Sequence, residues 1–184
     1  LRSNEDTLKQ YPYAFKLWVR YELKECTLTI RYTIENDSTC DMPFSFGLHP
    51  AFMTSNNGIN GSQKVQFTNQ ETNLPEAILD TKSNCLEFTD AFFEKTATLL
   101  LENVNSAYVV LVDGLNRMKV SVMGYKWLAF WKKPAASFIC IEPWLGHSDF
   151  EEVNCDFSER EGTLILAPHK SFVINHCLEA SISE

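Results

Sequence analysis

The stretch Phe15-Lys-Leu-Trp-Val-Arg-Tyr-Glu-Leu23 carries an apolar side chain at every second position, and Cys26-Thr-Leu-Thr-Ile-Arg-Tyr-Thr-Ile34 repeats this pattern after a short Lys24-Glu25 link. Side chains of a β-strand point alternately to opposite faces, so a period of two predicts a strand with one buried face. The short link predicts that the two strands form an antiparallel hairpin. We expect both strands to be half-buried in a twisted sheet.

The rest of the chain continues the strand pattern. Further β-rich runs occur near residues 63–68, 97–102, 106–112, 117–123, 126–131, 137–142, 162–166 and 171–179. The best helical candidate, Asp90–Lys95, is only one or two turns long, and no other segment shows a sustained helical period. Many short strands at regular spacing predict an all-β sandwich or barrel. We expect residues 1–184 to form a single domain of this class.

Composition narrows the range of partners. The 184 residues include 16 Lys and Arg against 24 Asp and Glu, which gives a formal net charge of −8. Binding to a phosphate backbone needs clustered Lys and Arg that displace counterions, so nucleic acid is a poor partner. No run approaches the roughly 18 apolar residues of a membrane-spanning helix. We expect a soluble protein that binds neither nucleic acid nor membrane.

The cysteines and histidines lack the spacing of a metal site. The six cysteines form no Cys-x-x-Cys pair, and the four histidines form no His-x-x-x-His or His-Glu-x-x-His pattern. We therefore predict no metal and no cofactor. Three disulfides are one possibility, but Cys26, Cys140 and Cys177 lie in strand-like runs, where a free thiol acts as a small hydrophobe. With reduced thiols and no secretion signal in view, we expect the protein in the cytoplasm.

The first stretch that can carry chemistry is Met42-Pro-Phe-Ser-Phe-Gly-Leu-His49-Pro-Ala-Phe52. His49 is the titratable side chain among the aromatic residues of this segment. Two interpretations fit the pattern. His49 is either a core-edge histidine satisfied by a backbone carbonyl, or a general acid held between aromatic rings for a polar substrate.

The second stretch is Phe138-Ile-Cys-Ile-Glu142-Pro-Trp-Leu-Gly146, which places a carboxylate at the end of an apolar strand. Burying an unpaired carboxylate is costly, so Glu142 either has a cationic partner or lies at the floor of a pocket with a raised pKa. The alternative is a strand-end glutamate turned to solvent. Trp131 and Trp144 lie in the same third of the chain, and aromatic rings stack on the C–H faces of sugars as well as filling cores.

Taken together, the two stretches favour a catalytic interpretation. A histidine acid and a glutamate base in an aromatic cleft suit proton transfer on a neutral sugar, and this chemistry needs no cofactor. We expect His49 and Glu142 to face each other across one cleft, with room for a sugar ring between them.

These two stretches, together with Gly162-Thr-Leu-Ile-Leu-Ala-Pro168, resemble the aldose 1-epimerase (galactose mutarotase-like) family, and its LacX-like branch in particular. The resemblance runs from about Tyr11 to the C-terminus. It implies a β-supersandwich of large antiparallel sheets with a sugar cleft on a concave face. It also implies an isomerase that interconverts the α and β anomers of an aldohexose or a sugar phosphate. His49 would protonate the ring oxygen, Glu142 would deprotonate the anomeric hydroxyl, and Trp131 and Trp144 would contact the sugar.

The chain also departs from the family pattern. The family has an N-terminal part with a His-Gly-Phe-Ala-Arg type motif that nothing here matches, so we expect the chain to represent the C-terminal two-thirds of the fold. Phe93-Glu-Lys-Thr96-Ala97 stands where the branch often has Phe-x-x-Asp-Ala, so Thr96 would replace an acidic sugar ligand and alter substrate choice. The alternative function is therefore a non-catalytic carbohydrate-binding module. The sequence leaves the oligomeric state open.

Overall fold

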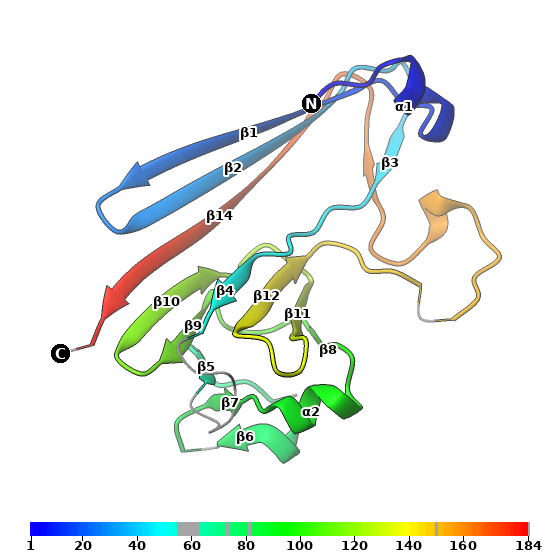
Figure 1. The fold of residues 1–184 in the computed structure, drawn as a ribbon. Coiled ribbons are helices and arrows are strands. Elements are labelled where there is room, and N and C mark those ends of the chain that lie inside the picture. The colour runs from blue at the N-terminus through cyan, green and yellow to red at the C-terminus, as the bar shows by residue number, and fades with distance from the viewer. Residues whose placement is uncertain (55–62, 73, 81, 150, 184) are drawn as a thin grey trace.

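Antiparallel β-sheets are the main regular structure of the computed structural model, which describes residues 1–54, 63–72, 74–80, 82–149 and 151–183 (Figure 1). An eight-stranded sheet has the order β1-β2-β14-β10-β9-β5-β7-β6, a four-stranded sheet has the order β4-β12-β11-β8, and β13 pairs with β3. The strands are β1 (Phe15–Lys24), β2 (Thr27–Asn36), β3 (Met42–Phe44), β4 (Ala51–Met53), β5 (Gln63–Phe67), β6 (Leu79–Asp80), β7 (Cys85–Glu87), β8 (Leu99–Glu102), β9 (Tyr108–Asp113), β10 (Asn116–Ser121), β11 (Trp127–Trp131), β12 (Phe138–Trp144), β13 (Leu164–Leu166) and β14 (Ser171–Ile182). The predicted all-β class is confirmed.

The predicted hairpin is formed by β1 and β2, which pair from Phe15 opposite Asn36 to Lys24 opposite Thr27. The prediction was wrong for Cys26, which lies in the two-residue turn rather than in a strand and is exposed. Glu25 has a φ of 54°, and this left-handed conformation reverses the chain before β2 can begin.

The expected burial of β1 holds only at its first residues. Val19, Tyr21 and Leu23 are 40%, 66% and 74% exposed, although they lie on the apolar face of the hairpin. The reason is the position of β1 at the edge of the eight-stranded sheet, where β2 is its only neighbour in the strand order. Figure 1 shows β1, β2 and β14 running side by side, with β1 outermost.

The main core lies between the eight-stranded and the four-stranded sheets. Val65, Val109 and Val120 of the larger sheet and Phe130 and Ile141 of the smaller sheet are all 0% exposed and belong to one apolar cluster. Burial of such side chains contributes about 1.5–3 kcal/mol each, which fixes the two sheets face to face. Because strand side chains alternate, the neighbours of Ile141 on β12 must point away from this core.

In the described part of the chain, two short α-helices and two 3-10 helices accompany the strands: α1 (Glu5–Gln10), α2 (Asp90–Lys95), η1 (Glu76–Ile78) and η2 (Phe157–Glu159). Helix α2 has the predicted bounds, and its N-cap Thr89 accepts a hydrogen bond from the backbone of Phe92. Helix α1 was not predicted because it buries no residue and therefore has no apolar stripe; its signal is the capping box between Asn4 and Thr7. Within the described ranges, no helix is long and apolar enough to cross a membrane.

Candidate active site

Strand β12 places Glu142 and Cys140 on the face of the four-stranded sheet that points away from the core. Glu142 pairs with Ala129 of β11, and Cys140 lies between Trp131 of β11 and Ala51 of β4. Both residues are about 1% exposed. Cys140 therefore has hydrogen-bonded strands on both sides, whereas Glu142 has β11 on one side and the segment that precedes β4 on the other.

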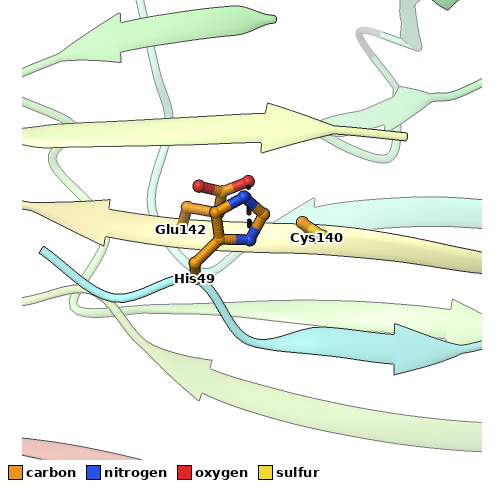
Figure 2. A group of neighbouring side chains, drawn as sticks. All are labelled: His49, Cys140 and Glu142. Atoms are coloured by element: carbon orange, nitrogen blue, oxygen red, sulfur yellow. Dashed lines mark ion pairs between the residues drawn. The ribbon is translucent and has the colours of Figure 1, made fainter. Parts of the chain in front are cut away.

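His49 reaches the same face from the segment between β3 and β4, which follows β12 closely. The backbone N–H of Leu48 donates to the carbonyl of Pro143 at 3.0 Å, and that of Ile141 donates to the carbonyl of Pro50 at 3.3 Å. These two bonds flank His49 and hold its backbone along β12. Figure 2 shows the resulting arrangement, in which the imidazole lies over the Glu142 carboxylate, with Cys140 on the same strand.

The imidazole and the carboxylate are in contact. Nδ1 of His49 lies 3.4 Å from Oε1 of Glu142, which is an ion pair when His49 is protonated. The His49 side chain is 63% exposed and that of Glu142 only 2%. The contact does not have hydrogen-bond geometry, so Oε1 has no hydrogen-bond partner among the described residues. Our expectation of a ring-sized gap between the two side chains was wrong, because His49 covers Glu142 directly.

Burial governs the protonation of both groups on β12. The pKa of Glu142 is raised by burial, while His49, when protonated, and the nearby Trp144 indole act in the opposite direction. Burial also raises the pKa of the Cys140 thiol to about 11, with a further contribution from the negative charge of Glu142. Glu142 is thus buried with a raised pKa and has His49 beside it, whereas the alternative of a strand-end glutamate turned to solvent was wrong.

Both predicted tryptophans lie near the pair. The ring of Trp131 meets the imidazole of His49 edge-on, with centroids 5.9 Å apart, and lies 5.7 Å from the ring of Phe138. Trp144 ends β12, and its indole N–H donates to the carbonyl of Leu48 at 3.0 Å. Trp131 therefore offers an aromatic surface beside His49, whereas Trp144 holds the segment that carries His49.

The structure does not bring Thr96 into this group. Thr96 is the C-cap of α2, where its backbone N–H donates to the carbonyl of Phe92. The contacts described for Thr96 join it to its own helix, and none of them reaches His49 or Glu142. Its role as a sugar ligand stays a prediction.

Sequence reasoning missed Cys140 as a site residue because it treated the thiol as a core hydrophobe. The donor atoms of His49, Cys140 and Glu142 all lie within 4.8 Å of one another. The signal was the spacing of two residues between Cys140 and Glu142, which puts both on one face of a strand.

Comparison with known proteins identifies the family. A family model described as aldose 1-epimerase matches residues 1–159. The chain belongs to the aldose 1-epimerase family. A search of curated proteins gives no match.

Solved structures of aldose 1-epimerase relatives share the fold. A galactose mutarotase-like protein from Lactobacillus casei superposes with a TM-score of 0.85 at 22% identity, over 98% of this chain and 68% of its own. A galactose mutarotase related enzyme from Lactobacillus acidophilus gives 0.84 at 25% identity, over 100% of this chain and 67% of its own. A galactose mutarotase-like protein from Clostridium acetobutylicum gives 0.66 at 19% identity, over 100% of this chain and 61% of its own. The chain thus spans about two thirds of the first two relatives and less of the third.

Proposed function

We propose that this aldose 1-epimerase family member interconverts the α and β anomers of an aldohexose or its phosphate. The observation that carries the proposal is the 3.4 Å contact between an exposed imidazole and a buried carboxylate on one sheet face. Ring opening needs a base at the anomeric hydroxyl and an acid at the ring oxygen. The acid and the base must lie close together because these two oxygens are bonded to the same carbon. Two groups in contact can reach two such oxygens at once, so the sugar would bind over the pair rather than between its members.

The reaction starts from the ion pair, with His49 protonated and Glu142 ionised. Glu142 takes the proton from the anomeric hydroxyl, the bond between C1 and the ring oxygen breaks, and His49 gives its proton to the ring oxygen. The open aldehyde turns about its C1–C2 bond, and the reverse proton transfers close the ring as the other anomer. Both protons return to their starting places, so no cofactor is consumed.

The burial of each group suits its role. Oε1 of Glu142 lacks a hydrogen-bond partner among the described residues, so it is free to accept the proton of the anomeric hydroxyl. The side chain of His49 is 63% exposed, so the imidazole can rotate away from the carboxylate when the sugar binds. Trp131, whose ring lies beside His49, is placed to stack on the apolar face of the sugar.

The test is Glu142→Gln, which keeps the shape of the side chain but cannot take a proton. Polarimetry of a freshly dissolved α-aldohexose should show a loss of acceleration of about 10²–10⁴-fold, the usual contribution of a general base. His49→Asn should cost a similar factor, and the double variant little more, because both groups act on one ring opening. Glu152→Gln, which makes the same change at an exposed position, is the matched control and should stay active.

Near-full activity of Glu142→Gln would contradict the proposal. A wild-type protein that binds a sugar without accelerating its mutarotation would instead support the non-catalytic carbohydrate-binding module.

A further inference from the structure

We propose that His49, Cys140 and Glu142 also form a site for a thiophilic divalent cation such as Zn²⁺, and that occupation of this site blocks the acid–base pair. The three donor atoms come from two segments distant in sequence, and all lie within 4.8 Å of one another (Figure 2). The second part of the proposal rests on the function proposed above, whereas the first part does not.

The donor set matches the coordination chemistry of zinc. Imidazole nitrogen, thiolate sulfur and carboxylate oxygen are its usual protein ligands, at about 2.0–2.3 Å from the metal. A tetrahedral centre with these bond lengths sets its ligand atoms about 3.3–3.6 Å apart. Nδ1 of His49 and Oε1 of Glu142, at 3.4 Å, already have this separation. The remaining pairs, at up to 4.8 Å, require an adjustment of about 1 Å.

Charge and burial favour an occupant at this position. The Oε1 atom of Glu142 is buried and has no hydrogen-bond partner among the described residues, which is an unfavourable state for a polar atom. The negative charges of the Glu142 carboxylate and the Cys140 thiolate would balance the charge of a divalent cation, so the occupied site would have no net charge. Because a thiolate and an imidazole belong to the set, zinc is favoured over the oxygen-seeking Mg²⁺ and Ca²⁺.

The backbone holds the donors in place before any ion binds. Cys140 and Glu142 project from the same face of β12, which is hydrogen-bonded to β4 at Cys140 and to β11 along both positions. The segment carrying His49 is bonded to β12 on either side of the histidine. The exposed side of His49 leaves a fourth position open to water, as in zinc sites that bind an exchangeable ligand.

A cation bound here would be coordinated by the two atoms that transfer protons in the isomerase reaction, Oε1 of Glu142 and Nδ1 of His49. Oε1 of Glu142 could no longer accept the proton of the sugar, and Nδ1 of His49 could no longer carry one. We therefore expect zinc to inhibit mutarotation, and removal of metal with a chelator to leave the rate undiminished.

Cobalt binding tests the site without any need for activity, because a cysteine thiolate bound to Co²⁺ gives a charge-transfer band in the near ultraviolet. The more accessible thiols Cys26, Cys40, Cys155 and Cys177 are first replaced by serine, so that they do not contribute. We expect one equivalent of Co²⁺ to produce the band, and Zn²⁺ to displace it. Cys140→Ser should abolish the band and weaken zinc binding by at least about tenfold. Even the replacement of a residue that only hydrogen-bonds to a metal ligand lowers metal affinity by about that factor.

Two further variants make the result decisive. His49→Asn changes an exposed side chain, so it should fold normally and still lose zinc affinity. Cys85→Ser alters another buried thiol, on β7, and should keep the band. Absence of the band in the parent protein, or its retention in Cys140→Ser, would overturn the metal site.

The activity measurement separates this inference from the proposed function. Each protein is compared with itself, with and without zinc: the rate of the parent should fall on addition of zinc, whereas the rate of Cys140→Ser should be the same with and without it. A protein that binds cobalt but shows no metal-free mutarotation would refute the proposed function and leave the site intact. An active protein that binds zinc without losing rate would refute the block.

Discussion

Gly47 and Trp144 lie so close together that no side chain fits at position 47. A Cβ atom on Gly47 would stand 2.7 Å from Cδ1 and 3.1 Å from Cγ of the indole. The two residues also form an antiparallel β-bridge, and the indole N–H bonds to the carbonyl of Leu48. This close approach lays the segment before His49 flat on β12, and thereby sets the position of the imidazole over Glu142.

Gly47→Ala should therefore reduce mutarotation by about 10²-fold, because a displacement of about 1 Å at a catalytic group costs that much. The added methyl must push the Trp144 indole and the backbone of Leu48 apart, at a cost of about 1–3 kcal/mol of stability. Initial rates by polarimetry and urea unfolding measure the two effects. Gly114→Asn changes a turn glycine with φ +61° and no atom within 4 Å of its Cβ position, so it should leave both unchanged.

The fold class and the pair of His49 and Glu142 could be predicted from the sequence, but the direct contact between the two side chains could not. A period of two identifies long strands such as β1 and β2, whereas β3 and β4 have three residues each and are too short to show a period. His49 and Glu142 could be predicted from residue types that are rare within apolar segments. Their direct contact depends on the backbone bonds between the Leu48–Pro50 segment and β12, which no local pattern encodes. The same bonds bring Cys140 into the group.

Asp90→Ala should strongly destabilise the protein. The Lys132 ammonium, whose side chain is 1% exposed, lies 2.6 Å from the Asp90 carboxylate and 2.7 Å from the carbonyl of Ala136. The second carboxylate oxygen accepts the N–H of Ala135. Removing the carboxylate leaves a buried positive charge without its counterion, which typically costs about 3–5 kcal/mol. Urea unfolding at neutral pH measures the loss.

The matched control for this pair is the double variant Asp90→Ala with Lys132→Met. It removes both charges and keeps an unbranched chain in the buried position, so it should recover most of the lost stability. A single Asp90→Ala variant as stable as the wild type would show that the ammonium finds water or another partner.

The cost of removing an apolar side chain from the hairpin should depend on whether it lies on the edge strand β1 or on the inner strand β2. Tyr21 and Ile30 are directly opposite each other, yet Tyr21 is 66% exposed and Ile30 only 9%. Tyr21→Thr should change the free energy of unfolding by less than about 0.5 kcal/mol, as for most surface changes. Ile30→Ala should cost about 2–5 kcal/mol. Equal effects in urea unfolding would mean that the exposed face of β1 is covered in solution.

His176 should make the protein sensitive to mild acid. This side chain on β14 is 1% exposed, and its Nδ1 contacts the hydroxyl of Ser121 at 3.4 Å, while Nε2 has no partner among the described residues. Burial lowers the pKa of His176 from 6.5 to about 4. The folded protein therefore holds the imidazole neutral at pH values where the unfolded chain protonates it.

The sign of the pH dependence follows from this difference. Above pH 6.5 neither state binds the proton, so the contribution of His176 to stability is complete there; between pH 6.5 and about 4 only the unfolded chain binds it, and stability falls. The loss approaches about 1.4 kcal/mol per pH unit and reaches about 3 kcal/mol near pH 4.

Urea unfolding from pH 7.5 to 4 should show a shallower fall in stability for His176→Gln than for the wild type. His169→Asn, at an exposed turn position with a φ of 57°, should follow the wild-type curve. If His176→Gln follows it too, the acid sensitivity belongs to the carboxylates, and His176 is not buried in the neutral form.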